Sequence, residues 1–304
     1  MKILVAVDGS PYSETALGLV GALRIGRKSE ATILTVIPVH VFPGGRTLAD
    51  LLGRSPALKE QLRKAEEARA LQLLAGPAET LGARGLKVDT TVRRGNPADE
   101  IMKACRSIRP DLVLVGSKGT SAIPEFPLGG VAHKVIKYAP CSVLLAKKES
   151  RSIDRVLVPI DGSRYSDEVV QFLSGLPLPR RAEVVLMTVV QPWAAALVKA
   201  YGGDVEGSRR IIAELRKTEE EAAQRLMTES ESQLRKGGYT ISALVARGDP
   251  AQEILREAGR RKADLIALGA KGITGVRRFL LGSVSQRVAR NAEASVLIVR
   301  PPGR

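Results

Sequence analysis

Val156-Leu157-Val158-Pro159-Ile160-Asp161-Gly162-Ser163 is the stretch of this 304-residue chain that indicates its fold. Five apolar residues are followed by Asp-Gly-Ser, which predicts a short buried strand ending in a turn. The same pattern, Ile3-Leu4-Val5-Ala6-Val7 followed by Asp8-Gly9-Ser10, occurs 153 residues earlier. The chain therefore contains one structural unit twice.

The duplication extends along both halves without net insertion. The shift also aligns these segments: Thr35-Val36 with Thr188-Val189, Arg94-Gly95 with Arg247-Gly248, Pro97-Ala98 with Pro250-Ala251, Asp111-Leu112 with Asp264-Leu265, and Gly116, Gly119 and Gly129 with Gly269, Gly272 and Gly282. About 150 residues suffice for a domain with its own core. We expect one domain at 1–148 and a second at 153–301, joined by a short polar segment.

Strand and helix signals alternate in each half. Ser13 and Ser166 are expected to cap the first helix of each half, and Pro97 and Pro250 to occupy the first position of a later one. Strands are predicted at 31–39, 88–92, 112–115 and 142–145, and at 184–190, 241–245, 265–268 and 295–299. Long amphipathic helices are predicted at 56–81 and 208–236. Five parallel strands covered by helices, a three-layer α/β sandwich, are expected in each domain.

Composition narrows the function classes. Apolar residues make up 44% of the chain and aromatic residues only 3%, and no stretch is long and apolar enough to span a bilayer. We expect a cytoplasmic protein. Cys105 and Cys141 are expected to be small buried packing residues, because Ala258 and Ala294 replace them in the second half. The two histidines have no metal-ligand spacing, which disfavours a zinc site.

The net charge of +15 raises the question of nucleic-acid binding. Residues 1–150 hold 22 basic and 14 acidic residues, and the rest of the chain holds 25 and 18, so the charge is spread evenly. Stacking aromatic residues, which usually accompany basic binding stripes, are scarce. A specific nucleic-acid site is disfavoured, while a general attraction to polyanions stays open.

The second half carries a glycine loop suited to phosphate. Gly269-Ala270-Lys271-Gly272 is followed after nine residues by Gly282-Ser283-Val284-Ser285, directly after a strand and at the start of a helix. Free N–H groups at a helix start bind anions, glycines allow close backbone approach, and serine hydroxyls add donors. The dinucleotide and P-loop fingerprints do not fit. A nucleotide site is predicted at this edge, with Asp161 beside it.

The chain resembles the universal stress protein family over both halves, through Val-Pro-Ile-Asp-Gly-Ser, Arg-Gly-Asp-Pro-Ala, and Gly-Ala-Lys-Gly with Leu-Gly-Ser-Val-Ser. The resemblance implies an open five-stranded parallel sheet of order 3-2-1-4-5 in each domain, two domains packed as a pseudo-dimer, and ATP or a related adenine nucleotide as ligand, with any metal, such as Mg²⁺, left open. It implies that Asp161 contacts the ribose and that the backbone near Pro159 and Val189 frames the adenine. The implied ribose and phosphate residues are Gly269, Gly272, Gly282, Ser283, Val284 and Ser285.

The first half departs from this pattern. Gly130 and Ala132 replace the two serines, and Pro124 and Glu125 stand opposite Arg277 and Arg278, of which Arg277 is a candidate phosphate ligand. The loss of two charge-assisted contacts, each worth about 1.5–3 kcal/mol, would weaken nucleotide binding by several orders of magnitude. A weaker first-domain site would use Asp8, Val36, Gly116, Gly119 and Gly129.

These observations favour a nucleotide-responsive regulator that presents a surface to an unidentified protein partner, with a homo-oligomer left open. No set of catalytic residues surrounds the expected phosphates, so we expect no enzyme, or at most slow ATP hydrolysis with Asp161 as a metal-linked carboxylate. The alternatives are a slow ATPase and a polyanion-binding protein that uses the net positive charge.

Overall fold

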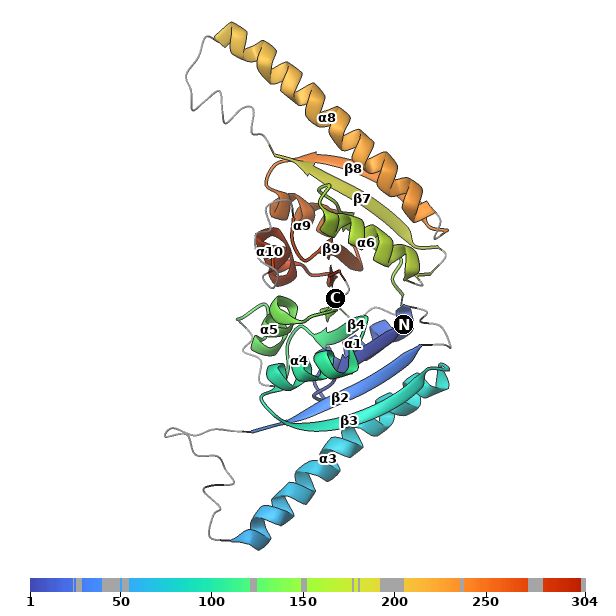
Figure 1. Ribbon diagram of the computed structural model, residues 1–304, viewed down its shortest axis with the longest axis vertical. Coiled ribbons are helices and arrows are strands. Elements are labelled where there is room, and N and C mark those ends of the chain that lie inside the picture. Colours follow the sequence, from blue (N-terminus) through green and yellow to red (C-terminus); the bar gives the residue numbers. More distant parts are fainter. Residues whose placement is uncertain are drawn as a thin grey trace. The chain divides into compact units, whose positions relative to one another are not determined.

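The chain folds into two compact units, Met1–Ser152 and Ile153–Arg300, in the computed structural model (Figure 1). The structure describes residues 1–23, 25, 29–39, 50, 55–120, 125–148, 152–176, 178–179, 181–191, 205–235, 238–272 and 281–301. Each unit is described below by itself.

The first unit alternates strands and helices. Its elements are β1 (Lys2–Ala6), α1 (Pro11–Ala22), β2 (Glu30–Pro38), α3 (Pro56–Ala83), β3 (Lys87–Gly95), α4 (Pro97–Ile108), β4 (Leu112–Gly116), α5 (Gly130–Tyr138) and β5 (Ser142–Ala146). The strands are parallel and pair in the order β3-β2-β1-β4-β5.

The second unit repeats the arrangement. Its elements are β6 (Arg155–Pro159), α6 (Arg164–Gly175), β7 (Glu183–Val190), α8 (Val205–Arg235), β8 (Thr240–Arg247), α9 (Pro250–Arg260), β9 (Leu265–Gly269), α10 (Ser283–Asn291) and β10 (Ser295–Val299). Its parallel strands pair in the order β8-β7-β6-β9-β10.

Helices cover both faces of each sheet. In the second unit α8 and α9 both contact β7 and β8, and they pack against different helices, α6 and α10 respectively. In the first unit α3 and α4 share β2 and β3 in the same way. The central strands are consequently buried over nearly their whole length, as in β4, whereas the edge strands β3 and β8 are half-exposed. The predicted α/β class, with two parallel-sheet domains, is confirmed.

The caps of the first helices differ from the prediction. Ser10 and Ser163, not Ser13 and Ser166, are the N-caps of α1 and α6, and each accepts the backbone N–H of the serine three residues later. Ser13 and Ser166 lie inside the first turn, where their hydroxyls donate back to the cap carbonyls. The prediction was wrong because two serines with capping chemistry flank each helix start. In the first half, Pro11 fixes the choice, since proline favours the first helical position.

Candidate functional site

The predicted nucleotide residues of the second unit meet at the carboxyl ends of three neighbouring strands. Pro159 ends β6, Val189 lies one residue before the end of β7, and Gly269 ends β9. Since β6 pairs in parallel with both β7 and β9, these ends lie at one edge of the sheet. Asp161 follows β6 at this edge, where ligands of open parallel sheets bind.

The turn after β6 fixes the position of the Asp161 carboxylate. Gly162 has a φ of +77°, a conformation that costs a side-chain-bearing residue energy, and it lets the chain turn directly into α6. The carboxylate Oδ1 of Asp161 accepts the backbone N–H of Ser163 at 3.0 Å. The strand end, the carboxylate and the cap of α6 therefore form one rigid corner.

Gly272 lies so close to Asp161 that a side chain there would displace the carboxylate. A Cβ at Gly272 would stand 2.5 Å from Oδ2 of Asp161, far inside the contact distance of carbon and oxygen. Gly282 lies near the first segment of the loop, and its N–H donates to the carbonyl of Ala270 at 2.7 Å. The structure thus brings Asp161, Gly272 and Gly282 together, as the spacing predicts.

Helix α10 starts without a side-chain cap. Gly282 is its N-cap and makes no side-chain hydrogen bond, whereas α4, α6 and α9 are capped by Asn96, Ser163 and Asp249. The first N–H groups of a helix have no partner within the helix, and they carry the positive end of its dipole. The start of α10 therefore has the features of an anion site, and through Gly282 and Gly272 it lies near Asp161.

The two loop serines have different surroundings. Ser283 is exposed at the first position of α10. Ser285 is only 4% exposed, and its hydroxyl donates to the carbonyl of Gly269 at 2.7 Å. A hydroxyl has one proton to donate, so in this arrangement Ser285 fastens α10 to the end of β9. Ser283 is the serine whose side chain faces solvent at the site.

Lys271, inside the loop, was not singled out from the sequence. Its side chain is 7% exposed, and burial lowers its pKa from the usual value, with a smaller contribution from the positive charge of Arg300. A lysine between Ala270 and Gly272 gives no sequence signal of burial. The structure places Lys271 among the buried residues of the second unit.

The first unit keeps the carboxylate corner but not the serines. Asp8 accepts the N–H of Ser10 at 3.0 Å and, through Oδ2, the N–H of Thr120 at 3.1 Å. A Cβ at Gly119 would stand 2.6 Å from the same Oδ2. The other predicted positions lie at equivalent places: Val36 on β2, Gly116 at the end of β4 and Gly129 as the uncapped start of α5.

Gly130 is exposed and Ala132 is buried, at the positions of Ser283 and Ser285. The first unit therefore has the uncapped helix start without either hydroxyl.

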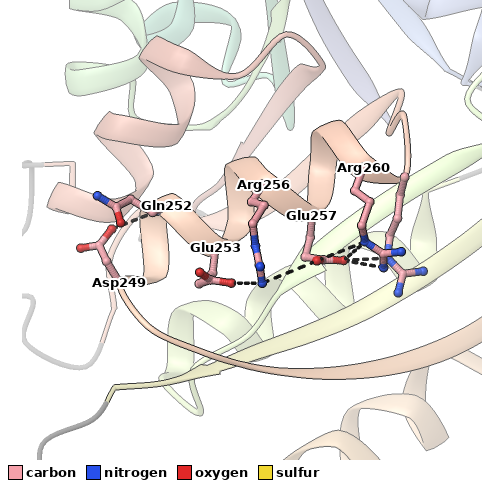
Figure 2. Close-up of polar contacts among 7 residues, drawn as sticks. Asp249, Gln252, Glu253, Arg256, Glu257 and Arg260 are labelled. Atoms are coloured by element: carbon pink, nitrogen blue, oxygen red, sulfur yellow. Dashed lines mark hydrogen bonds and ion pairs between the residues drawn. The ribbon is translucent and has the colours of Figure 1, made fainter.

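An ion-pair network along α9 was also missed (Figure 2). Glu257 is only 7% exposed and accepts hydrogen bonds from Arg260 at 2.7 Å and Arg261 at 3.3 Å, while Arg256 bonds Glu253. The hydrogen bond from Arg260 is the main cause that lowers the pKa of the Glu257 carboxyl, against the opposing effect of burial. The spacing of three and four residues was a sequence signal for these pairs. Arg256, Arg260 and Arg261 are therefore paired with Glu253 and Glu257, and these pairs partly neutralise the positive charge of α9.

A second polar contact joins the N-cap of α9 to α10. Asp249, the N-cap of α9, accepts the N–H of Gln252 at 2.9 Å and pairs with Arg287 of α10 at 3.0 Å. The Gln252 N–H is the first cause that lowers the pKa of Asp249, and Arg287 adds to it. This ion pair, separate from the network of Glu257, joins the N-cap of α9 to the helix that carries the candidate phosphate site.

Some predicted features lie outside the described residues. They are Arg277, Arg278, Pro124 and Trp193. In the part of the chain that the structure describes, no three His, Cys, Asp or Glu side chains gather as metal ligands, and no helix is long and apolar enough to cross a membrane.

Comparison with known proteins gives consistent matches. The model of the universal stress protein family matches residues 1–147 and again 152–300. A universal stress protein of Methanocaldococcus jannaschii is 35% identical over 148 residues, 49% of this chain and 82% of the relative. One from Mycolicibacterium smegmatis is 29% identical over 308 residues, 98% of this chain and 97% of its own.

Among solved structures, a universal stress protein from Archaeoglobus fulgidus superimposes with a TM-score of 0.63, covering 98% of both chains. At 22% identity, this likeness supports the fold.

Proposed function

The chain belongs to the universal stress protein family, and we propose that it is a nucleotide-responsive regulator that binds ATP, or a related adenine nucleotide, in its second unit. One observation carries the proposal. The start of α10 has no side-chain cap, presents the exposed Ser283, and lies beside a loop glycine pressed against Asp161. An uncapped helix start with a free hydroxyl is suited to phosphate, and a carboxylate beside it is suited to ribose hydroxyls.

Asp161 is the proposed ribose ligand. A carboxylate is an acceptor with two oxygens, which suits the paired hydroxyls of a ribose, and the N–H of Ser163 bonded to Oδ1 orients it at the strand edge. Pro159 ends β6 and Val189 lies one residue before the end of the neighbouring β7, and their backbone supplies the edge for the adenine in this proposal. Arg277, in the loop, would add charge to the phosphates.

The geometry refines the roles of the serines. In this proposal the Ser283 hydroxyl donates a hydrogen bond to phosphate. Ser285 has a structural role, because its hydroxyl donates to the carbonyl of Gly269 and so holds α10 at the end of β9. Removing the Ser283 hydroxyl should weaken ATP binding about 10- to 150-fold, the equivalent of a charge-assisted hydrogen bond of about 1.5–3 kcal/mol. The first unit lacks both hydroxyls and is proposed to bind nucleotide weakly or not at all.

Calorimetric titration with ATP tests the proposal. We expect one tight site per chain, strong weakening in Ser283→Ala, and no change in Gly130→Ala, the matched control at the same position of the first unit. A Cβ at Gly130 meets nothing within 4 Å, so this control should fold normally. Two equally tight sites, or equal losses from both variants, would contradict the assignment to the second unit.

Regulation has its own test. Trypsin cleaves after Arg277 and Arg278, inside the sequence between Gly272 and Gly282. If nucleotide orders this loop and so changes a surface read by a partner, ATP at a concentration that just saturates the wild type should slow cleavage of the wild type and much less that of Ser283→Ala. If bound ATP does not change the cleavage rate, the protein binds nucleotide but the proposed switch in this loop is refuted.

A further inference from the structure

A cavity of about 220 Å³ lies in the second unit at the amino ends of its strands, the edge opposite to the candidate nucleotide site. Its wall is formed by β6, β7 and the chain that leads from α9 to β9. The apolar part of the wall is buried, since the exposed fraction is 6% or less at Val156, Val185 and Ala263. The cavity is also lined by three charged residues that are less buried, Arg155, Glu183 and Arg261. It therefore has an apolar interior and a charged rim.

The charged groups of this rim can still bind a ligand. Arg155 and Glu183 are neighbours in the register of β6 and β7, yet neither side chain forms an ion pair with any residue that the structure describes. Arg261 bonds Glu257 through Nε at 3.3 Å, and the terminal nitrogens of its guanidinium have further N–H groups to donate. The rim consequently offers two cationic groups and one carboxylate.

The carboxylate of this rim has lost the partner that its counterpart has in the first unit. Glu30 stands at the position equivalent to Glu183 and pairs with Lys87 of the edge strand at 3.6 Å. In the second unit the residue opposite Glu183 on the edge strand is Thr240, which carries no charge. The same strand position is thus part of a surface ion pair in one unit and of a cavity rim in the other.

Two further differences between the units fall at the same place. Ala263 replaces Pro110 of the first unit, and the smaller side chain leaves more room beside the strands. Arg261 replaces Ile108 and adds a cation next to that room. The changes that separate the two units therefore combine apolar space, a cation and an available carboxylate in the second unit.

We infer that this cavity binds a small α-amino acid with an apolar side chain. The ligand carboxylate would be bound by Arg155 and Arg261, because the forked N–H groups of a guanidinium match a carboxylate. The ligand ammonium group would donate to Glu183, and the apolar side chain would fill the buried interior. The site uses none of the residues proposed for nucleotide binding.

The volume of the cavity indicates the size of the ligand. An apolar cavity of about 150 Å³ holds one benzene molecule, so 220 Å³ has room for about nine non-hydrogen atoms at the same density. Leucine has this size and valine is slightly smaller, whereas tryptophan is too large. Leucine is therefore the ligand to test first.

The experiment titrates the full chain with L-leucine at millimolar concentrations, followed by calorimetry and by saturation-transfer NMR of the leucine methyl groups. We expect one leucine per chain. Isocaproate lacks the ammonium group and isoamylamine lacks the carboxylate, so each should bind about 10-fold more weakly through loss of a charge-assisted contact. Glycine, which leaves the apolar interior empty, should give no measurable binding.

Variants of the rim locate the site. Arg155→Gln and Glu183→Gln should each lower the affinity for leucine about 10-fold. Thr240→Lys, which restores the ion pair of the first unit, should lower it as well by occupying the Glu183 carboxylate. The matched control is Lys2→Gln, at the position of the first unit equivalent to Arg155, and it should leave leucine binding unchanged.

Three results would overturn the inference. The first is the absence of leucine binding to the wild type, and the second is equal affinity for leucine and isocaproate. The third is unchanged leucine affinity in both Arg155→Gln and Glu183→Gln, which would place the ligand elsewhere. Melting temperatures show whether the variants fold, and if one does not, the comparison of leucine, isocaproate and isoamylamine on the wild type still decides the ligand class.

Discussion

Replacing Glu257 by glutamine should destabilise the second unit measurably. Glu257 is 7% exposed and is bonded by Arg260 and Arg261, whose side chains are 60% and 26% exposed. An exposed pair at this spacing contributes about 0.3–0.5 kcal/mol, whereas breaking a fully buried pair costs about 3–5 kcal/mol. Because the carboxylate is buried and Arg260 can return its charge to water, we expect a loss of about 2 kcal/mol.

The loss corresponds to a fall of about 4–8 °C in the melting temperature of a unit of this size. The assay is urea and thermal unfolding, followed by calorimetry and by the fluorescence of Trp193, the single tryptophan, which belongs to the second unit in sequence. The control is Glu221→Gln, whose partner Arg225 lies at 3.9 Å and whose side chain is 52% exposed. This control should change stability by less than about 0.5 kcal/mol.

The pH dependence gives the sharper test. The pKa of Glu257 is lowered from 4.5 in the folded protein, so its contribution is present above the unfolded value and is lost as the pH falls through the folded value. The difference between wild type and Glu257→Gln should be constant near neutrality, shrink below pH 4.5, and disappear once the folded carboxyl is protonated. Equal stabilities at pH 7, or a difference that persists in acid, would refute the argument.

Three further predictions concern other positions. Gly272→Ala should displace the Asp161 carboxylate and so lower both the unfolding free energy and the affinity for ATP. Gly259→Ala, whose Cβ meets nothing within 4 Å, should instead stabilise α9 by up to about 1 kcal/mol. Urea unfolding and ATP titration of the two variants measure these effects. Ser163→Ala should cost about 1 kcal/mol in unfolding free energy through loss of the α6 cap, and no loss would mean that another group caps the helix. Lys147 should lose its proton near pH 8, because burial and Lys118 lower its pKa, so its NMR titration midpoint should lie well below 10.5.

The repeat made most of the fold predictable. A shift that aligns Asp8 with Asp161 and Gly119 with Gly272 requires the same strand-turn corner twice, and the alternation of elements then gives the α/β class. Strand ends agreed or differed by at most three residues, and β10 agreed at both ends. The largest difference was at β3, where residues such as Arg94 pair with β2 outside the apolar pattern. The caps were misplaced, because Ser10 and Ser13 have the same side-chain chemistry and only the backbone decides between them.

The candidate site was predictable in position but not in detail. Glycine spacing located the loop beside Asp161, since the carboxyl ends of parallel strands share an edge. The sequence could not show that the Ser285 hydroxyl turns inward to Gly269, because two serines in one turn look alike until the packing separates them. Burial of Lys271 and Glu257 depends on neighbours distant in sequence, which no local pattern contains.

The contact between a carboxylate and a glycine has a consequence for how such chains are classified. Asp8 faces Gly119 in the first unit as Asp161 faces Gly272 in the second, with the same lack of space for a side chain. In the first unit this pair ties the loop to the turn through the N–H of Thr120, a task that needs no ligand. Aspartate and glycine at these positions therefore do not by themselves identify a nucleotide site, because the fold needs them in both units. If the proposed site in the second unit is correct, the residue at the start of the following helix, where Gly130 and Ser283 differ, is the better criterion for classifying such chains.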